Sequence, residues 1–409
     1  MHRAVAPRLS LMMFLNYVVW GAWYVTIGTY LTQTLNFSGT QAGAVFGTAA
    51  LASMISPFFV GLIADRFFAA ERVMCTLHLM GAVLLYLVST AKTFTAVYLL
   101  MLAYCLCFFP TLALTNSLTL RNVSNPAADF PRIRMFATIG HIVINVIIGS
   151  LQIERAATPF VISAGASVVM GLYCLTLPHT PPKAKGETAS WRTAIGLDAV
   201  VMMKDRSFAV FVIASVLACI PLAFYFSFTN AYLNESGVTN AAGKMTLGQV
   251  AEIGMMLLMP LVYRRIGLKM ILLLGLAAWS ARYVMLAFGN AGDLMWLFYG
   301  AILLHGICYD FFFMTGQLYT DQEAPQHLRG TAQGFIMFLT YGLGMFLGSL
   351  LSGWTVDFFT TAEGRNWRAF WLASAASAFL ILLLLGVFFR SRERIRTGQP
   401  EAAAESVER

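Results

Sequence analysis

Charged residues are scarce in this sequence. Only 11% of its 409 residues are Asp, Glu, Lys or Arg, whereas 58% are hydrophobic. A soluble domain carries about 25% charged residues, so this chain has too few to cover a water-facing surface. The composition therefore excludes an ordinary cytosolic enzyme, a nucleic-acid-binding module and a disordered chain.

Sequence motifs for nucleotide, metal or acyl chemistry are also missing. The chain has no GxxxxGK[ST] loop, no HExxH, no GxSxG and no cysteine pair at metal-ligand spacing. Its six cysteines all fall in apolar stretches, where small packing residues are common. We therefore expect no cofactor, no metal, no ATP-driven step and no enzymatic activity.

Long apolar stretches are what the sequence has in abundance. They are each about 20 residues long, which is the length a helix needs to cross a hydrocarbon layer of about 30 Å. They do not alternate apolar and polar residues, so a β-barrel is excluded. The sequence predicts an all-α membrane protein with twelve transmembrane helices, at 9–32, 41–63, 73–91, 95–118, 134–152, 158–176, 207–230, 246–263, 270–288, 294–317, 331–355 and 368–389.

The basic residues indicate how the chain is oriented. Twelve spans place both termini on one side of the bilayer, and 21 of the 27 Lys and Arg lie on that side. The positive-inside rule then makes both termini cytoplasmic. We interpret the net charge of +8 as an orientation signal and expect no nucleic-acid partner. The other six basic residues are Lys92, Arg155, Lys244, Arg282, Arg365 and Arg368.

A polar linker at 177–206 divides the spans into six and six. It contains Pro181, Pro182 and five Lys and Arg. The predicted organisation is an N-terminal six-helix bundle at 1–176, the cytoplasmic linker, a C-terminal six-helix bundle at 207–390 and a cytoplasmic tail at 391–409. Two such halves are the plan of the major facilitator fold, and we expect a monomer. The loop Gly61-Leu62-Ile63-Ala64-Asp65-Arg66 resembles the G-x-x-x-D-R loop of that superfamily.

The span at 134–152 carries a polar stripe. Arg134, Thr138, His141 and Asn145 are spaced at i, i+4, i+7 and i+11, which puts them on one face of a helix. A stripe this deep in an apolar helix favours contact with water or substrate in a cavity. The alternative is that these side chains only hydrogen-bond to neighbouring helices.

Two further spans contain acidic residues. Gln249 and Glu252 share one face of the span at 246–263, and Asp310 lies among aromatic residues in the span at 294–317. Helical spacing places Asp310 on a face with Gly306, Phe313 and Gln317. Burying an acid in a bilayer is costly and favours its neutral form, so such a group is suited to take and release a proton. The alternatives are that Glu252 pairs with a structural arginine such as Arg282 and that Asp310 fastens neighbouring helices.

Over nearly its full length the chain resembles the bacterial nucleoside:proton symporters, a family of the major facilitator superfamily. The resemblance is carried by Trp20-Gly21-Ala22-Trp23, by Asp129-Phe130-Pro131 through Arg134 and Thr138, by Gln249-Val250-Ala251-Glu252 and by Tyr309-Asp310-Phe311-Phe312. It implies a carrier that imports nucleosides with protons by alternating access. The substrate-binding residues that follow from it and from the polar positions are Arg134, Thr138, His141, Phe226, Gln249, Glu252, His305, Tyr309 and Asp310, with Glu252 and Asp310 also coupling to protons.

Four positions depart from the family pattern. Ala223 and Phe226 stand where relatives carry amides, His141 stands where an aromatic is expected, and His305 replaces a tyrosine. Losing two hydrogen-bonding partners and gaining two imidazoles alters which ligands the site prefers. The ligand is then a nucleoside or a related glycoside. A major facilitator carrier for a sugar or drug, and a non-transporting membrane sensor, remain as alternatives.

Overall fold

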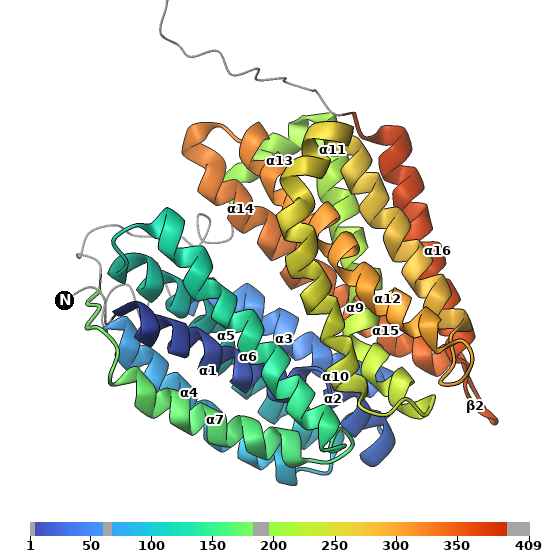
Figure 1. Ribbon diagram of the computed structural model, residues 1–409, viewed down its shortest axis with the longest axis horizontal. Coiled ribbons are helices and arrows are strands. Elements are labelled where there is room, and N and C mark those ends of the chain that lie inside the picture. Colours follow the sequence, from blue (N-terminus) through green and yellow to red (C-terminus); the bar gives the residue numbers. More distant parts are fainter. Residues whose placement is uncertain (1–4, 60–67, 183–195, 391–409) are drawn as a thin grey trace, which may run out of the picture.

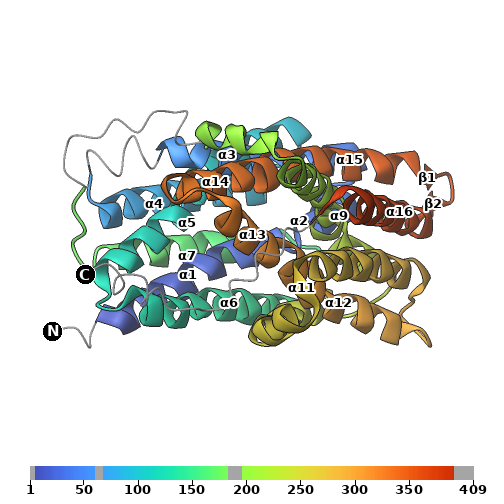
Figure 2. The same cartoon turned by 90° about the horizontal axis from the view of Figure 1, so that it is seen from above.

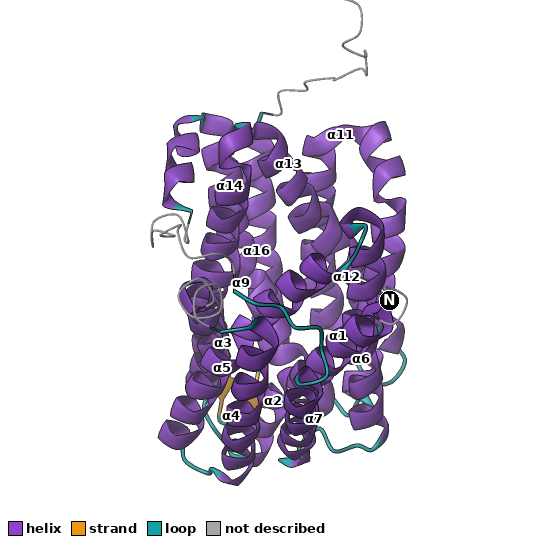
Figure 3. Ribbon diagram, turned by 90° about the vertical axis from the view of Figure 1, so that its left-hand side faces the viewer, coloured by secondary structure: helices purple, strands orange, loops and turns teal. Residues whose placement is uncertain are grey.

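The computed structural model describes residues 5–59, 68–182 and 196–390. The predicted G-x-x-x-D-R loop and the C-terminal tail lie outside these described residues. Within them the fold is almost entirely helical, apart from one short hairpin of strands β1 (Thr360–Thr361) and β2 (Gly364–Arg365). Figure 3 shows the long helices running side by side, with the hairpin in orange behind them in the lower part of the view.

The first half of the chain crosses the molecule six times, and the second half, which begins with the short 3-10 helix η4 (Leu197–Lys204), also crosses it six times. In the first half the elements are α1 (Val5–Tyr24), α2 (Ile27–Thr29), the π-helix η2 (Tyr30–Thr34), α3 (Gly39–Phe59), α4 (Ala70–Thr90), α5 (Phe94–Asn122), α6 (Pro126–Ser150) and α7 (Thr158–Cys174). In the second half they are α9 (Arg206–Glu235), α10 (Ala241–Met245), α11 (Leu247–Phe288), α12 (Met295–Tyr309), η5 (Asp310–Met314), α13 (Thr315–Glu323), η6 (Gln326–Leu328), α14 (Arg329–Met337), η7 (Phe338–Gly344), α15 (Met345–Phe358) and α16 (Trp367–Phe388).

These twelve passes confirm the predicted all-α architecture of two six-helix bundles. Nine helices of the described ranges are individually long and apolar enough to cross a membrane, and Thr158–Cys174 is a shorter apolar one. Two of the predicted spans, 246–263 and 270–288, are joined directly within α11. Gly267 makes the turn between them with φ +73°, a conformation that glycine adopts without strain.

Local sequence explains where several helices begin. The side chains of Thr93, Asn125, Asp205 and Asn366 each accept a hydrogen bond from the backbone N–H three residues further on. Such caps satisfy a donor that the first helical turn leaves unpaired. Pro126 at the first position of α6 reinforces that start, because its fixed φ suits a helix and the N–H that it lacks would be unpaired.

The two halves approach each other most closely at one end of the molecule. We call this end the distal face; it carries the loops at 151–157, 236–240 and 359–366, whereas the terminal face carries the start of α1 and the end of α16. Figure 1 shows the two groups of helices meeting near α2, α10 and α15 and diverging toward α14 and the N-terminus. Figure 2 shows α3 and α15, which come from different halves, lying side by side.

Glycines permit the close packing of α3 on α15. A Cβ added to Gly39 or Gly353 would collide with the backbone of the facing helix, and a Cβ on Gly43 would collide with the Ser349 carbonyl. Small residues four apart let two membrane helices approach backbone to backbone. Gly28 of α2 has the same role against Ser227 of α9. The distal face is therefore closed by direct helix contact.

A buried carboxylate reinforces the distal closure. Glu154, in the loop after α6, is 3% exposed. Its Oε2 accepts hydrogen bonds from the side-chain amides of Asn230 and Asn234, both at 2.7 Å, and its Oε1 accepts one from the backbone N–H of Ala242 at 3.0 Å. All three donors belong to the second half of the chain. We call this set the Glu154 clamp.

Candidate functional site

Arg134 projects from α6 toward α1. Its Nη2 donates a hydrogen bond to the hydroxyl of Tyr17, and its guanidinium lies 4.6 Å from the centre of the Tyr17 ring. The side chain is half-buried. Of the predicted polar stripe, Thr138 is also half-buried, whereas His141 and Asn145 are buried.

Aromatic rings from both halves meet beside this arginine. The Trp20 ring lies 4.9 Å from Tyr24 and 5.7 Å from His141. Across the boundary between the halves, Tyr24 lies 6.1 Å from Phe226 of α9. Phe226 in turn lies 6.0 Å from His305 of α12. The structure thus brings His141, Phe226 and His305 into one aromatic chain.

Glu252 is the most accessible acid of the site. It lies in the first part of α11, and 26% of its side chain is exposed. Its Oε2 is 3.9 Å from His305 Nε2, which is beyond hydrogen-bond distance. A Cβ on Gly306 would collide with the backbone of Ala251 and Glu252, so α12 packs closely against the turn that carries this acid.

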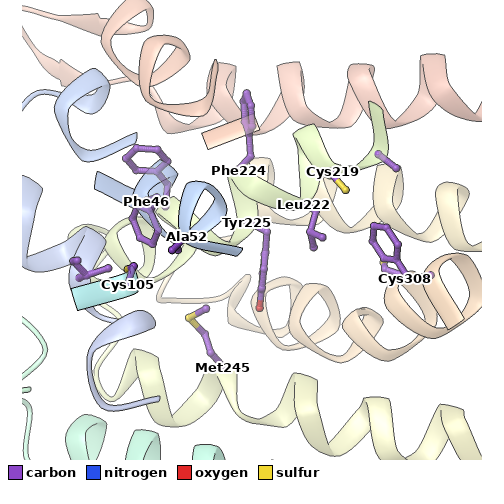
Figure 4. Packing of buried hydrophobic residues seen from close by; sticks show 14 of the residues in the cluster. Phe46, Ala52, Cys105, Cys219, Leu222, Phe224, Tyr225, Met245 and Cys308 are labelled. Carbon is purple, nitrogen blue, oxygen red and sulfur yellow. The ribbon is translucent and has the colours of Figure 1, made fainter. Parts of the chain in front are cut away.

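Arg282 does not pair with Glu252, contrary to the alternative considered from the sequence. Its Nη1 lies 3.1 Å from His305 Nδ1, and its guanidinium carbon lies 3.4 Å from the centre of the Tyr225 ring. Figure 4 shows Tyr225 pointing away from its neighbour Phe224, whose ring instead turns toward the α16 side and stacks on Phe370 at 4.9 Å. Of these two neighbouring residues of α9, Tyr225 therefore contacts residues of the site, whereas Phe224 packs in the core.

Asp310 is deeper than Glu252. It is fully buried, and neither of its carboxylate oxygens has a hydrogen-bond partner among the described residues. It begins the π-helix η5, and single π-helical turns inside α-helices are frequent at functional sites. Gly306, which packs against the backbone of Glu252, lies one helical turn before Asp310, so the two acids belong to one site.

The shared face predicted for Asp310 and Gln317 is wrong. Gln317 is exposed, whereas Asp310 is fully buried. The π-helical turn inserts an extra residue per turn between them, so α-helical spacing no longer applies. Phe313 does remain in the neighbourhood of the site, with its ring 5.5 Å from that of Tyr309.

Tyr309 and Tyr341 are joined by a hydrogen bond between their hydroxyls. Tyr341 lies in η7, another π-helical stretch, and the Tyr309 ring lies 5.9 Å from His305. The Gln249 amide nitrogen, in the orientation that satisfies its neighbours, donates to the Met245 carbonyl at 3.0 Å.

Ala223 is fully buried and faces Gly348 of α15. Of the two altered α9 positions, Phe226 is therefore the one whose ring joins the aromatic chain.

Sequence reasoning missed three tyrosines of the site, Tyr17, Tyr24 and Tyr341. The first two could have been found, because Tyr17, Trp20 and Tyr24 follow i, i+3, i+7 spacing on α1. Trp23 lies outside the site, because its indole N–H donates to the hydroxyl of Tyr104 in the core of the first half. For Tyr341 the sequence offered no comparable signal, because it lies in a π-helical stretch.

A pocket of about 640 Å³ opens between the beginnings of α1 and α6 at the terminal face. Its lining includes Ser10, Phe14, Arg132 and Phe136. Phe14 is one turn before Tyr17 on α1, so this pocket lies next to the candidate site but does not include it.

Comparison with known proteins identifies the family of this chain. A family model described as nucleoside H⁺ symporter matches residues 3–394. The chain is 39% identical over 401 residues to a putative nucleoside transporter, YegT, of Escherichia coli (strain K12), covering 94% of each chain. It is 32% identical to the xanthosine permease of the same organism, covering 94% of this chain and 95% of the relative.

A solved structure shares the fold as well. The crystal structure of the nucleoside transporter NupG superposes with a TM-score of 0.88 at 29% identity, covering 95% of this chain and 99% of that chain. The family model covers most of the sequence, and the acids, the arginine and the aromatic rings described above come together between the two halves. The chain belongs to the nucleoside H⁺ symporter family, and it is a multi-pass membrane transporter coupled to protons rather than an enzyme.

Proposed function

We propose that this chain imports nucleosides together with protons, and that the substrate binds between Arg134 of the first half and Glu252 of the second. The observation that supports this most strongly is the chain of aromatic rings that crosses the boundary between the halves, from Tyr17 beside Arg134 to His305 beside Glu252. Opposite charges that come from the two bundles separate or re-pair when the bundles move. A substrate bound between them is therefore linked to that movement.

The aromatic chain provides the surface for a flat base. Trp20 and Tyr24 come from one half and Phe226 from the other, and ring contacts join them. Rings of this kind favour offset-stacked or edge-on contact with another π-system. Arg134, held by Tyr17, is placed to donate to a base carbonyl, since a guanidinium only donates. Thr138 lies one turn further along α6 and is half-buried.

The polar residues of α11 and α12 supply the sugar and proton chemistry. The Glu252 carboxylate accepts hydrogen bonds from hydroxyls, and the Gln249 amide adds an acceptor on the same helix face. Asp310 has no hydrogen-bond partner and is fully buried. Burying an ionised carboxylate without partners is very costly, so Asp310 is neutral in this state and serves as the inner proton site. Glu252, which is more exposed, exchanges protons with the water between the two halves.

Alternating access then follows from the shape of the molecule. With both termini in the cytoplasm of the bacterial inner membrane, the distal face is the outer one. The Glu154 clamp and the contact of α3 with α15 close that face, so this state is open toward the cytoplasm. The moving units are the six-helix bundles at 1–176 and 207–390, joined by the linker at 177–206, and the working unit is a monomer.

Phe226 favours a nucleoside over a simple sugar as the ligand. At this position an aromatic ring replaces the amide that the family resemblance leads one to expect, and it contacts both Tyr24 and His305. The change removes a hydrogen-bonding partner but adds stacking surface, which a base uses and a simple sugar uses less. A glycoside with a flat aglycone fits the same surface.

Transport into liposomes tests the proposal. Purified protein is reconstituted, and uptake of radiolabelled nucleosides is followed with an imposed inward proton gradient. We expect accumulation that a protonophore abolishes and that Glu252→Gln abolishes, while Glu363→Gln in the exposed hairpin leaves it unchanged. Uptake that is insensitive to both the protonophore and Glu252→Gln contradicts proton coupling through this residue.

A further inference from the structure

Arg282 is a buried cation with an unusual set of contacts. It is 0% exposed, and arginine is almost never fully buried unless it is paired. Among the described residues no carboxylate lies within ion-pair distance of it. It lies over the Tyr225 ring and approaches one ring nitrogen of His305. Burying an arginine without an ionic partner is costly, which indicates that Arg282 has a role in the site.

The contact with His305 determines which nitrogen of that imidazole carries the proton. The Arg282 guanidinium has only donors, so His305 Nδ1, at 3.1 Å from Nη1, has to be the acceptor. A neutral imidazole whose Nδ1 accepts carries its hydrogen on Nε2. Arg282 therefore selects the Nε2–H tautomer, an assignment that follows from hydrogen-bond logic.

The His305 ring is also fixed in direction. It stacks on Tyr225 with centres 5.6 Å apart and planes at 20°, and it contacts Phe226 and Tyr309. Its Nε2 faces Glu252 Oε2 at 3.9 Å, beyond direct hydrogen bonding. A donor and a carboxylate acceptor thus stand side by side. A hydroxyl is the group that can accept from the first and donate to the second at the same time.

We propose that Arg282 is a positioning residue that holds His305 as the Nε2–H tautomer, and that His305 Nε2–H and the Glu252 carboxylate together bind one hydroxyl of the substrate's sugar. The proposal rests on the nucleoside transport proposed above, and it adds Arg282 and the direction of each hydrogen bond. It also excludes His305 as the carrier of the transported proton, because a second proton on Nδ1 would point at the Arg282 cation.

The surroundings of His305 agree with a neutral ring. The titratable or charged groups that contact or face it are Arg282 and Glu252 of α11, Tyr225 of α9 and Tyr309 of α12. Arg282 opposes a charge on the ring, and only Glu252 favours one. The proton is therefore left to Glu252 and Asp310.

The tautomer can be observed directly in the wild-type chain. Solid-state NMR of ¹⁵N-histidine-labelled protein in lipid bilayers distinguishes protonated from unprotonated ring nitrogens, and the difference spectrum against His305→Gln assigns the signals. We expect a neutral ring with hydrogen on Nε2 from about pH 6 to about pH 8, a window around the ordinary pKa of histidine. A ring protonated on Nδ1, or on both nitrogens, overturns the proposal. This arm needs no transport, so it stands even if nucleoside uptake fails.

The second arm measures what the tautomer does for the substrate. Uptake of one ribonucleoside and of its 2′-, 3′- and 5′-deoxy analogues is compared in wild type, Arg282→Met and His305→Gln. We expect Arg282→Met to raise KM for the ribonucleoside about tenfold with a smaller change in kcat, the size of one lost hydrogen-bond donor. The preference over one particular deoxy analogue should disappear, and His305→Gln, which keeps a donor, should retain part of it.

Arg368→Met is the matched control. Arg368 lies 4.2 Å from the Phe288 ring near the distal face, so its loss removes a similar cation–ring contact without touching the site. It should leave KM and the analogue preferences unchanged. A uniform loss of uptake for all four ligands in Arg282→Met, with the preferences intact, shows a merely structural role and refutes the hydroxyl assignment.

Discussion

Tyr24 of the first half and Phe226 of the second half lie with their ring centres 6.1 Å apart, across the boundary between the bundles. The chain of rings that they belong to has Arg134 beside one end and Glu252 beside the other. Because each charge belongs to a bundle that moves relative to the other, binding a ligand between them and moving the bundles are physically linked. This relationship motivates the predictions below.

The first prediction concerns Tyr17, which holds Arg134 in place. Tyr17→Phe removes the hydroxyl that accepts from the guanidinium but keeps the ring beneath it. Losing one hydrogen bond costs about 1 kcal/mol, so KM for nucleoside should rise about fivefold with kcat nearly unchanged. Uptake kinetics in liposomes measure both constants. Tyr173→Phe, which removes a hydroxyl bonded to the Arg8 carbonyl away from the site, is the control and should behave as wild type. An unchanged KM in Tyr17→Phe would show that the hydrogen bond from Arg134 to Tyr17 does not position the guanidinium for ligand binding.

The second prediction concerns the inner proton site. Asp310→Asn keeps the shape of the side chain but cannot bind or release a proton. A proton gradient should no longer drive accumulation, while exchange of internal for external nucleoside continues, because exchange needs no net proton movement. Counterflow and gradient-driven uptake are measured in the same vesicles. Asp293→Asn, at an exposed position, should change neither. Normal gradient-driven accumulation by Asp310→Asn would remove this acid from the coupling mechanism.

The third prediction concerns the Glu154 clamp. Glu154→Gln replaces a carboxylate that accepts three hydrogen bonds with an amide whose nitrogen cannot accept any. Leaving buried donors unpaired costs about 1–3 kcal/mol each, so the closed distal face should become less populated. Spin labels are attached at Thr158→Cys and Asp293→Cys in a Cys75→Ser background. Opening of the distal face is seen as a larger fraction of molecules with a long distance between the two labels.

The control for the clamp is an ion pair within one half of the chain. Glu235→Gln breaks the contact of Glu235 with Arg365 at 2.9 Å, and both residues belong to the second half. It should leave the distance distribution between the labels unchanged. If the distance distribution between the labels is the same with and without Glu154→Gln, helix packing alone closes this face.

The fourth prediction concerns Phe226. Phe226→Ala removes the ring that contacts Tyr24 and His305. An aromatic pair contributes about 0.5–1.5 kcal/mol beyond its buried area, so nucleoside affinity should fall about two- to tenfold, and Phe226→Tyr should restore most of it. Thermal-shift titration with nucleosides, free bases and sugars measures this, because a ligand that binds the folded state raises its stability. Equal losses for all three ligand classes would argue against base stacking.

The sequence predicted the twelve spans well because their apolar character depends only on composition and length. It also singled out Arg134, Glu252 and Asp310, since an ionisable residue in an apolar span is expensive and therefore conspicuous. Gly267, with its positive φ, was not needed to separate the two spans of α11, because the basic residues there already marked a loop.

Partners within the membrane were harder to predict. Arg282 was considered as a partner of Glu252, but it contacts His305 and Tyr225, residues on two other helices. The prediction that Asp310 and Gln317 share one helix face failed because a π-helical turn changes the spacing of the residues. A sequence does not reveal such a turn. Both errors concern packing between or within helices, on which hydropathy carries no information.

The most direct test of the account is an experimental structure of this chain with a nucleoside bound. We predict density for the base against Trp20, Tyr24 and Phe226, with Arg134 at its edge, and one sugar hydroxyl between His305 Nε2 and the Glu252 carboxylate. A nucleoside bound elsewhere, with Arg134 and Glu252 in direct contact and no ligand between the two halves, would contradict it.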